Sequence, residues 1–310
     1  NCLDYYEASP EMQKLADSVV SLWPSAQVKT RGESTDLATI SFGEALKLCP
    51  GEKFAEQPIG AFCSGTLVGK DLVLTAGHCI TDEASCADAR FVFGYNIDGA
   101  GKAAKTTVPS KDVYGCKKIV GRDLDKEHSG YIGLALNIAK YILNLAGPDY
   151  AVVQLDRPVE GRQPLPINRK VFDKPKADEP VFVIGHPVGL PVKVAGGAKV
   201  RKYGFKAFFT TDLDTFGGNS GSAVFNAKTN LIEGILVRGG TDFKDTPAGC
   251  KTQVKLGQDE GRGEAVTKIS RAKKFIPSLD KDDKESPETV DMAPIQAAPA
   301  GEELSGKVQF

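Results

Sequence analysis

Short apolar runs broken by turn-forming residues are the feature of this sequence that most restricts its fold. Segments rich in Val, Ile, Leu and Phe alternate with Gly, Pro, Asp and Asn, and the 310 residues include 33 glycines. A buried strand needs only a few apolar residues, whereas a helix needs a longer run with apolar positions three to four residues apart. The pattern therefore predicts an all-β protein with many turns.

The predicted strands fall into two sets along the chain. The first set comprises Ser18–Trp23, Thr66–Val68, Leu72–Leu74, Arg90–Phe93 and Tyr150–Leu155. The second comprises Val181–Ile184, Phe208–Thr210, Ala223–Phe225 and Leu231–Val237. Helices are expected only near Glu11–Asp17, in an amphipathic stretch at Leu134–Leu145, and in a short C-terminal helix beginning at Arg271 and ended by Pro277.

Composition divides the chain into segments. We expect an N-terminal segment at 1–17, a body at 18–277 with an insertion at 121–148, and a tail at 278–310. The tail has eight acidic residues against three lysines and almost no aromatic residues, so we expect it to be mobile. The formal net charge of −1 gives no basic field that would attract nucleic acid.

Seven cysteines indicate an oxidising compartment. None lies in a C-x-x-C pair, which argues against a zinc ribbon. The odd count leaves one thiol free or paired with another chain. No apolar run is long enough to span a membrane, and the chain begins at Asn1. We therefore expect processed protein or an expressed fragment, secreted or periplasmic, whose signal peptide is missing.

His78 lies in the first of three segments that suggest chemistry. Two predicted strands lead into Thr75-Ala76-Gly77-His78-Cys79, and Cys63 precedes the first of them. A Cys63–Cys79 bridge would close a loop of about 16 residues, worth roughly 3 kcal/mol, and would restrain the histidine. A catalytic base needs this rigidity, because proton transfer requires hydrogen-bond reach. Cys86 and Cys116 form a second plausible pair, whereas Cys2, Cys49 and Cys250 stay unassigned.

Ser220 lies in the second segment, Phe216-Gly217-Gly218-Asn219-Ser220-Gly221-Ser222. Its glycines allow a tight turn in which the N–H groups of Gly218 and Ser220 point at one spot, as in an oxyanion hole. Asp149 is in the third segment, directly before a buried strand. A carboxylate there can accept from an imidazole N–H and fix the histidine tautomer.

These segments occur in the order His, Asp, Ser. T-A-G-H-C, D-Y-A-V-V-Q-L and G-N-S-G-S together resemble the trypsin/chymotrypsin-like serine peptidases, over about residues 18–277. Thr211–Phe225, with G-N-S-G-S, is most similar to the bacterial V8-like glutamyl endopeptidases.

The resemblance implies two six-stranded β-barrels, about 18–160 and 161–277, with a triad in the cleft between them. Ser220 would attack a peptide carbonyl, His78 would shuttle the proton, and Asp149 would orient His78, without any cofactor. An α/β-hydrolase is excluded, because its histidine follows the serine and here the last histidine is His186.

Activation by a new amino terminus, as in the animal enzymes, is not expected. Asn219 replaces the aspartate that would pair with that terminus. Ile119-Val120-Gly121 resembles the terminus itself, but cleavage there would discard His78, so we interpret it as an ordinary strand and turn. A propeptide, a proteinaceous inhibitor or the N-terminal segment is the more plausible control.

Specificity stays open between three alternatives. Family spacing places Asp214 and Thr215 at the S1 pocket, and Glu264 could approach it, which favours Lys or Arg at P1. Arg238 and Gly239 lie on the strand that should line S1, and Arg238 could neutralise Asp214 or select acidic residues. A third class of P1 residue also remains. The V8-like histidine is absent, since Leu236 or Val237 occupies its place.

The other two histidines are not expected to act in catalysis: His186 is interpreted as structural and His128 as exposed. No spacing of residues indicates a metal site. The primary prediction is a serine endopeptidase acting on protein or peptide substrates. The alternatives are a non-catalytic binding protein on a protease scaffold and a narrowly specific processing protease gated by the 121–148 insertion.

Overall fold

The computed structural model describes residues 2–124, 147–170, 175–203, 207–213, 217–239, 242–254 and 263–279. The predicted Leu134–Leu145 helix, His128 and the tail beyond Leu279, for which mobility was predicted, lie outside these residues. None of the helices in the described part has the length and hydropathy that crossing a bilayer needs.

The first barrel closes in the order β11-β12-β8-β7-β2-β9. Its strands are β2 (Val19–Pro24), β7 (Cys63–Gly69), β8 (Leu72–Thr75), β9 (Ala89–Phe93), β11 (Val113–Leu124) and β12 (Asp149–Leu155). All neighbours are antiparallel, and most side chains of β2, β7 and β12 are buried. The short apolar strands thus close into a barrel without sheet edges, so that each strand has a neighbour on both sides to pair with its backbone N–H and C=O groups.

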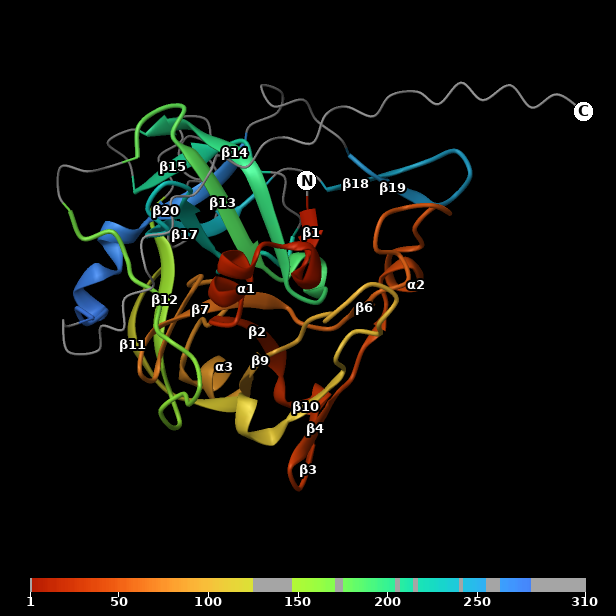
Figure 1. The fold of residues 1–310 in the computed structure, drawn as a ribbon, viewed down its shortest axis with the longest axis horizontal. Helices are drawn as coiled ribbons and strands as arrows, with labels where there is room; N and C mark the ends of the chain where they lie inside the picture. Colours follow the sequence, from red (N-terminus) through yellow and green to blue (C-terminus); the bar gives the residue numbers. More distant parts are fainter. Residues whose placement is uncertain are drawn as a thin grey trace, which may run out of the picture.

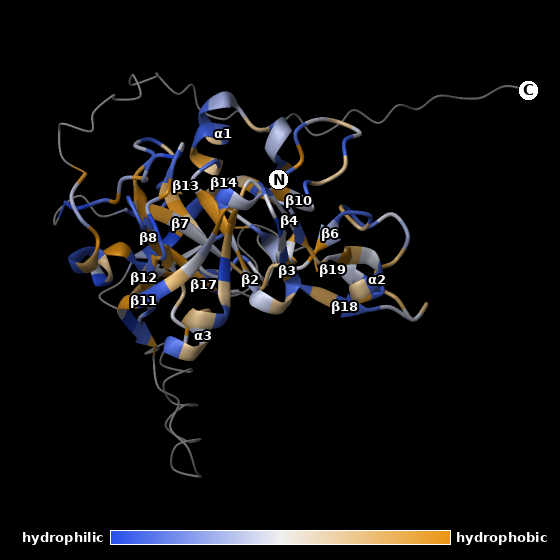
Figure 2. Ribbon diagram, turned by 90° about the horizontal axis from the view of Figure 1, so that it is seen from below, coloured by the Kyte–Doolittle hydropathy of each residue, from blue (hydrophilic) through white to orange (hydrophobic). Residues whose placement is uncertain are grey.

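The second barrel closes in the order β14-β13-β16-β17-β20-β15, because β15 also pairs with β14. Its strands are β13 (Pro180–Gly185), β14 (Lys193–Tyr203), β15 (Phe208–Thr211), β16 (Ala223–Asn226), β17 (Ile232–Arg238) and β20 (Glu264–Lys268). Figure 1 shows this barrel above the first, and Figure 2 shows apolar residues concentrated in the barrel strands. The double six-stranded barrel is confirmed.

The C-terminal helix consists of two 3-10 turns, Ile269–Arg271 and Lys273–Phe275. The predicted N-terminal helix is α1 (Pro10–Ala16), with Ser9 as its N-cap and Pro10 in its first turn. α3 (Glu83–Asp88) precedes β9. Before α1, β1 (Cys2–Asp4) and the 3-10 turn Tyr5–Glu7 come first, and β1 adds to the edge of β14. The N-terminal segment is therefore part of the second sheet.

Two smaller units lie outside the barrels. β3 (Val28–Arg31), β4 (Ser34–Leu37) and β10 (Thr107–Pro109) form a three-stranded sheet, flanked by 3-10 turns at Ser25–Gln27 and Ser110–Asp112. The other unit, which we call the satellite, combines residues 40–59 with 242–254. It contains β5 (Ile40–Ser41), α2 (Phe42–Leu46), β6 (Pro58–Ile59), β18 (Phe243–Asp245) and β19 (Lys251–Gln253). Both ribbon views place α2 beside β18 and β19 (Figures 1 and 2).

The first residues of the expected insertion at 121–148 belong to a barrel strand, and 125–146 lie outside the described residues. β11 continues through Gly121 to Leu124, and Gly121 is paired with Val152. Ile119-Val120-Gly121 therefore lies inside a barrel strand, in agreement with its interpretation as ordinary structure. Phe275 of the C-terminal turns packs so closely on Gly121 that a Cβ at Gly121 would collide with the ring.

Candidate active site between the barrels

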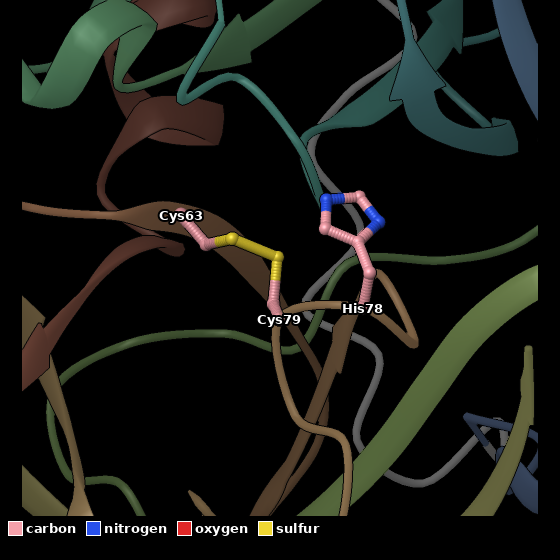
Figure 3. Close-up of side chains that lie close together, drawn as sticks. All are labelled: Cys63, His78 and Cys79. Atoms are coloured by element: carbon pink, nitrogen blue, oxygen red, sulfur yellow. A yellow bond between two sulfur atoms is a disulfide. The ribbon is translucent and has the colours of Figure 1, made fainter.

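His78 projects from a tight loop after β8. Cys79 is joined to Cys63 by a disulfide with a Cα–Cα distance of 6.2 Å, so the loop is tied to the start of β7. Figure 3 shows the imidazole and the disulfide extending from neighbouring residues of this loop. Cys63, His78 and Cys79 lie within 4.8 Å of one another, as metal ligands would. The disulfide leaves no thiolate to bind a metal, so this cluster is not a metal site.

Asp149, the first residue of β12, makes two hydrogen bonds to His78. Its carboxylate accepts from the His78 backbone N–H at 3.1 Å and contacts Nδ1 at 2.8 Å. Since an ionised carboxylate only accepts, Nδ1 must carry the proton, which leaves Nε2 as the basic nitrogen. Asp149 is 2% exposed, whereas the His78 side chain is 37% exposed. The carboxylate is thus held in the protein and the imidazole faces outward.

Close packing holds the Asp149–His78 pair in place. A Cβ added to Gly77 would lie 2.6 Å from the Asp123 carbonyl oxygen and 2.9 Å from that of Tyr150, so only glycine fits there. From the second barrel, the Thr267 hydroxyl of β20 accepts from the Asp149 N–H at 3.2 Å. The aspartate therefore lies where the two barrels meet.

Ser64 holds the Ser220 loop against the first barrel. Its backbone N–H donates to the Ser220 carbonyl at 2.9 Å, and its hydroxyl donates to the Gly218 carbonyl at 3.2 Å. The disulfide sulfur of Cys79 is 3.7 Å from the same Ser220 oxygen. Ser220 thus lies beside the residue that follows His78. Among the described residues, the Ser220 hydroxyl has no hydrogen-bond partner.

The Gly218 N–H is oriented by its own peptide group. The Gly217 carbonyl accepts from the Val188 N–H, and the C=O and N–H of a trans peptide point in opposite directions. The Gly218 N–H consequently points away from Val188. Gly218 has φ +83°, and a Cβ there would lie 2.7 Å from the Val188 nitrogen, so both conformation and space require glycine.

The Ser220 N–H is oriented in the same way. The Asn219 carbonyl accepts from the Ser222 N–H at 2.9 Å, which turns the Ser220 N–H to the opposite side. Within the described part of the chain, neither the Gly218 N–H nor the Ser220 N–H donates to a protein acceptor. The Asn219 side chain is buried and accepts from the Ser222 hydroxyl at 3.1 Å.

The residues expected at S1 are only partly described. Asp214 and Thr215 lie outside the described residues. Arg238 ends β17 and is exposed, as is Gly239. Glu264, 8% exposed on β20, places its carboxylate against the Cα of Gly239, where a Cβ would collide with it. The end of β17 therefore has one buried acidic residue, Glu264, and one exposed basic residue, Arg238, beside it.

His186 lies behind the Ser220 loop. It is 1% exposed, its Nδ1 is 2.9 Å from the Leu190 carbonyl oxygen, and its ring stacks on Tyr95 at 5.8 Å. The pKa of His186 is lowered from 6.5 to about 3, mainly by burial; the hydrogen bond to Leu190 raises it and the nearby Lys193 charge lowers it. The imidazole is neutral at physiological pH.

The structure pairs Cys63 with Cys79 and Cys86 with Cys116, as expected from the sequence. The third bridge joins Cys49 to Cys250 across 201 residues and leaves Cys2 as the unbridged cysteine. Sequence reasoning had not assigned this pair. It also missed Ser64, Thr267 and Asp242, whose carboxylate accepts from the Gly217 N–H at 2.6 Å. Only Ser64 had a signal, because it follows a cysteine of the His78 loop.

Comparisons with known proteins agree with this architecture. Residues 63–235, more than half of the chain, match the family model of the trypsin-like peptidase domain. A search of curated protein sequences gave no match. Among solved structures, human heparin binding protein has a TM-score of 0.50 at 12% identity, covering 89% of this chain and 94% of its own. The Vibrio cholerae VesB protease has a TM-score of 0.48 at 16% identity, covering 89% and 66%. With a family match over most of both barrels, the chain belongs to the trypsin-like peptidase family.

Proposed function

We propose that the chain is a serine endopeptidase whose triad is His78, Asp149 and Ser220. The observation that carries this proposal is the 2.8 Å contact between Asp149 and His78 Nδ1. It leaves Nε2 as the basic nitrogen of His78, and the sulfur of the next residue, Cys79, lies 3.7 Å from the Ser220 carbonyl oxygen. A buried carboxylate bonded to Nδ1 fixes the tautomer and the orientation of the ring, which a histidine without a chemical role does not need.

In the proposed mechanism, the Ser220 hydroxyl attacks the scissile carbonyl while His78 Nε2 takes its proton. The resulting oxyanion is stabilised by the N–H groups of Gly218 and Ser220, which donate to no acceptor in the described protein. His78 then gives the proton to the leaving amine, which departs and leaves an acyl-enzyme. Water attacks the acyl-enzyme by the same steps in reverse, and Asp149 stabilises the imidazolium each time.

For specificity we propose a preference for Lys or Arg at P1. The Glu264 carboxylate against Gly239 supports this choice, because a buried acid beside the strand edge would attract a cation. Asp214 would add to the same field. Arg238 opposes it, but its side chain is exposed, where solvent screens the charge. A glutamyl preference of the V8-like branch is not proposed, since Leu236 and Val237 are both buried aliphatic residues.

The proposed setting is a secreted or periplasmic protein, of bacterial type as the G-N-S-G-S segment suggests. Three disulfides support an oxidising compartment. The peptidase domain would span 18–277, with a propeptide or proteinaceous inhibitor as control. The alternative, a non-catalytic binding protein, is kept because one solved structure of this fold is named for heparin binding.

The test is parallel digestion of a mixed peptide library by the wild type and by Ser220→Ala, with every cleavage site read by mass spectrometry. We expect cleavage by the wild type alone, clustered after Lys and Arg. Fluorophosphonate labelling of the wild type without library cleavage would favour a narrowly specific, gated protease. Absence of both labelling and cleavage would contradict the proposal and favour the binding protein.

A further inference from the structure

The Gly217–Gly218 peptide is the weakest part of the proposed oxyanion hole. Two consecutive glycines have no side chains that pack, and glycine rotates more freely than any other residue. A flip of this peptide would replace the Gly218 N–H by a carbonyl oxygen, which would repel the developing negative charge. A functional hole therefore needs restraints from outside the loop.

Two contacts to Gly217 supply these restraints. Its carbonyl accepts from Val188 in the Pro187–Gly189 turn, and its N–H donates to the Asp242 carboxylate at 2.6 Å. The second bond has an ionised acceptor, and such bonds are about twice as strong as neutral ones. We propose that Asp242 is a positioning residue: it fixes the Gly217 N–H, which belongs to the preceding peptide, and so limits the rotation at Gly217 by which the oxyanion-hole peptide could flip. The inference rests on the proposed peptidase function.

Asp242 is itself fixed by the satellite. It directly precedes β18, and its carbonyl accepts from the Val254 N–H at 2.8 Å after β19. The Cys49–Cys250 disulfide ties the end of this hairpin to the α2 segment. The Cys49 N–H also donates to the Lys251 carbonyl at 2.9 Å.

Apolar contacts reinforce the same connection. Phe243 packs edge-on against Phe42 of α2, with ring centroids 5.9 Å apart. Val188 and Leu190 belong to the same apolar cluster as Phe42. Asp242 thus adjoins the disulfide-bridged satellite and Val188 packs against it, so the Cys49–Cys250 bond is a long-range support of the oxyanion hole.

Asp245 provides a matched control, because it carries the same charge on the same hairpin. Its backbone belongs to the β18–β19 pair, but its carboxylate makes no hydrogen bond or ion pair with any described residue. We expect Asp242→Ala to lower kcat on a peptide substrate by at least about tenfold, with little change in KM, because a charge-assisted bond is lost and the hole is used mainly in the transition state. Asp242→Asn keeps an acceptor oxygen and should retain most activity, whereas Asp245→Ala should equal the wild type.

Fluorophosphonate inactivation should slow in parallel with kcat in Asp242→Ala, since its phosphoryl oxygen occupies the same hole. Replacing Cys49 and Cys250 with Ser should lower kcat in the same direction. It should add little to Asp242→Ala, because both changes act through one contact. A wild-type kcat in Asp242→Ala, or equal losses in Asp242→Ala and Asp245→Ala, would overturn the proposal.

Hydrogen exchange at the Gly217 amide separates this inference from the proposed function. The amide should exchange faster in Asp242→Ala than in Asp245→Ala, whether or not the protein cleaves peptides. If the wild type neither cleaves nor labels, the peptidase proposal fails while the exchange result still decides the role of Asp242. Equal exchange in the two variants would refute that role.

Discussion

His186 should make the folded protein sensitive to moderate acid. Its Nδ1 faces the Leu190 carbonyl oxygen, so Nδ1 carries the proton and Nε2 is the bare nitrogen. Nε2 is buried and has no hydrogen-bond partner among the residues that the structure describes. Protonation would place a charge there without an acceptor, near the buried ammonium of Lys193, which explains why the pKa falls to about 3.

The magnitude follows from proton linkage. Below pH 6.5 the unfolded chain binds a proton at His186, whereas the folded protein does not until the pH approaches 3. Stability must therefore fall as the pH drops through this window. Each pH unit is worth about 1.4 kcal/mol, so between pH 7 and pH 4.5 this one group should cost roughly 2–3 kcal/mol of unfolding free energy.

His186→Phe isolates this contribution, because phenylalanine can stack on Tyr95 but does not titrate. Urea unfolding of both proteins at pH 7 and at pH 4.5 gives four free energies of unfolding. The variant should be less stable at pH 7, where the Leu190 carbonyl has lost its donor, yet it should lose about 2–3 kcal/mol less than the wild type on acidification. Carboxylates titrate equally in both proteins and cancel. If the wild type and the variant lost equal free energy of unfolding between pH 7 and pH 4.5, the assignment of His186 as a neutral, buried imidazole would be refuted.

Three further predictions concern charge pairs. Asp149→Asn should lower kcat by roughly 10³–10⁴-fold by disturbing the His78 tautomer, with the melting temperature nearly unchanged; a modest loss of kcat would contradict the triad. Asp4→Asn should destabilise the fold by about 3–5 kcal/mol in chemical denaturation, because the Lys193 ammonium, 2.5 Å from Asp4 and 2% exposed, loses its counter-ion. Adding Lys193→Met should recover most of this loss, and no recovery would argue against the ion pair as its cause. Glu264→Gln should reduce kcat/KM for a Lys-P1 substrate about tenfold relative to a matched Leu-P1 substrate, and an unchanged ratio would exclude Glu264 from P1 selection.

The two barrels were predictable because most of their strands are short, apolar and bounded by turn residues. β11 was recognised only at Ile119-Val120-Gly121, although it has 12 residues and pairs with both β9 and β12. Its pairing with β12 shifts register between Cys116 and Lys118 and again between Ile119 and Gly121. Each shift breaks the alternation of buried and exposed side chains, so the period of two that identifies a strand is lost.

β14 was missed for a different reason. It begins with Lys193, whose side chain is buried in the structure. When only the neighbouring residues are considered, a lysine at such a position argues against a buried barrel strand. The charge is accommodated by Asp4 and by the Gln57 side-chain oxygen at 2.7 Å. Both partners are more than 130 residues away in the chain, so only the folded structure shows why lysine is tolerated there.

The same distinction separates the residues proposed for catalysis from those that hold them. His78 and Ser220 are recognisable because each lies beside a glycine or a cysteine in a short motif, and Asp149 is recognisable because it directly precedes a buried strand. Ser64 and Val188 contribute backbone N–H groups, which every residue except proline offers, and Thr267 contributes a hydroxyl that many positions carry. Such supporting contacts leave no local pattern in the sequence. A variant library restricted to the motifs would therefore miss the supporting positions. Substitutions at those positions would change how the proposed catalytic residues are oriented without removing their reactive groups.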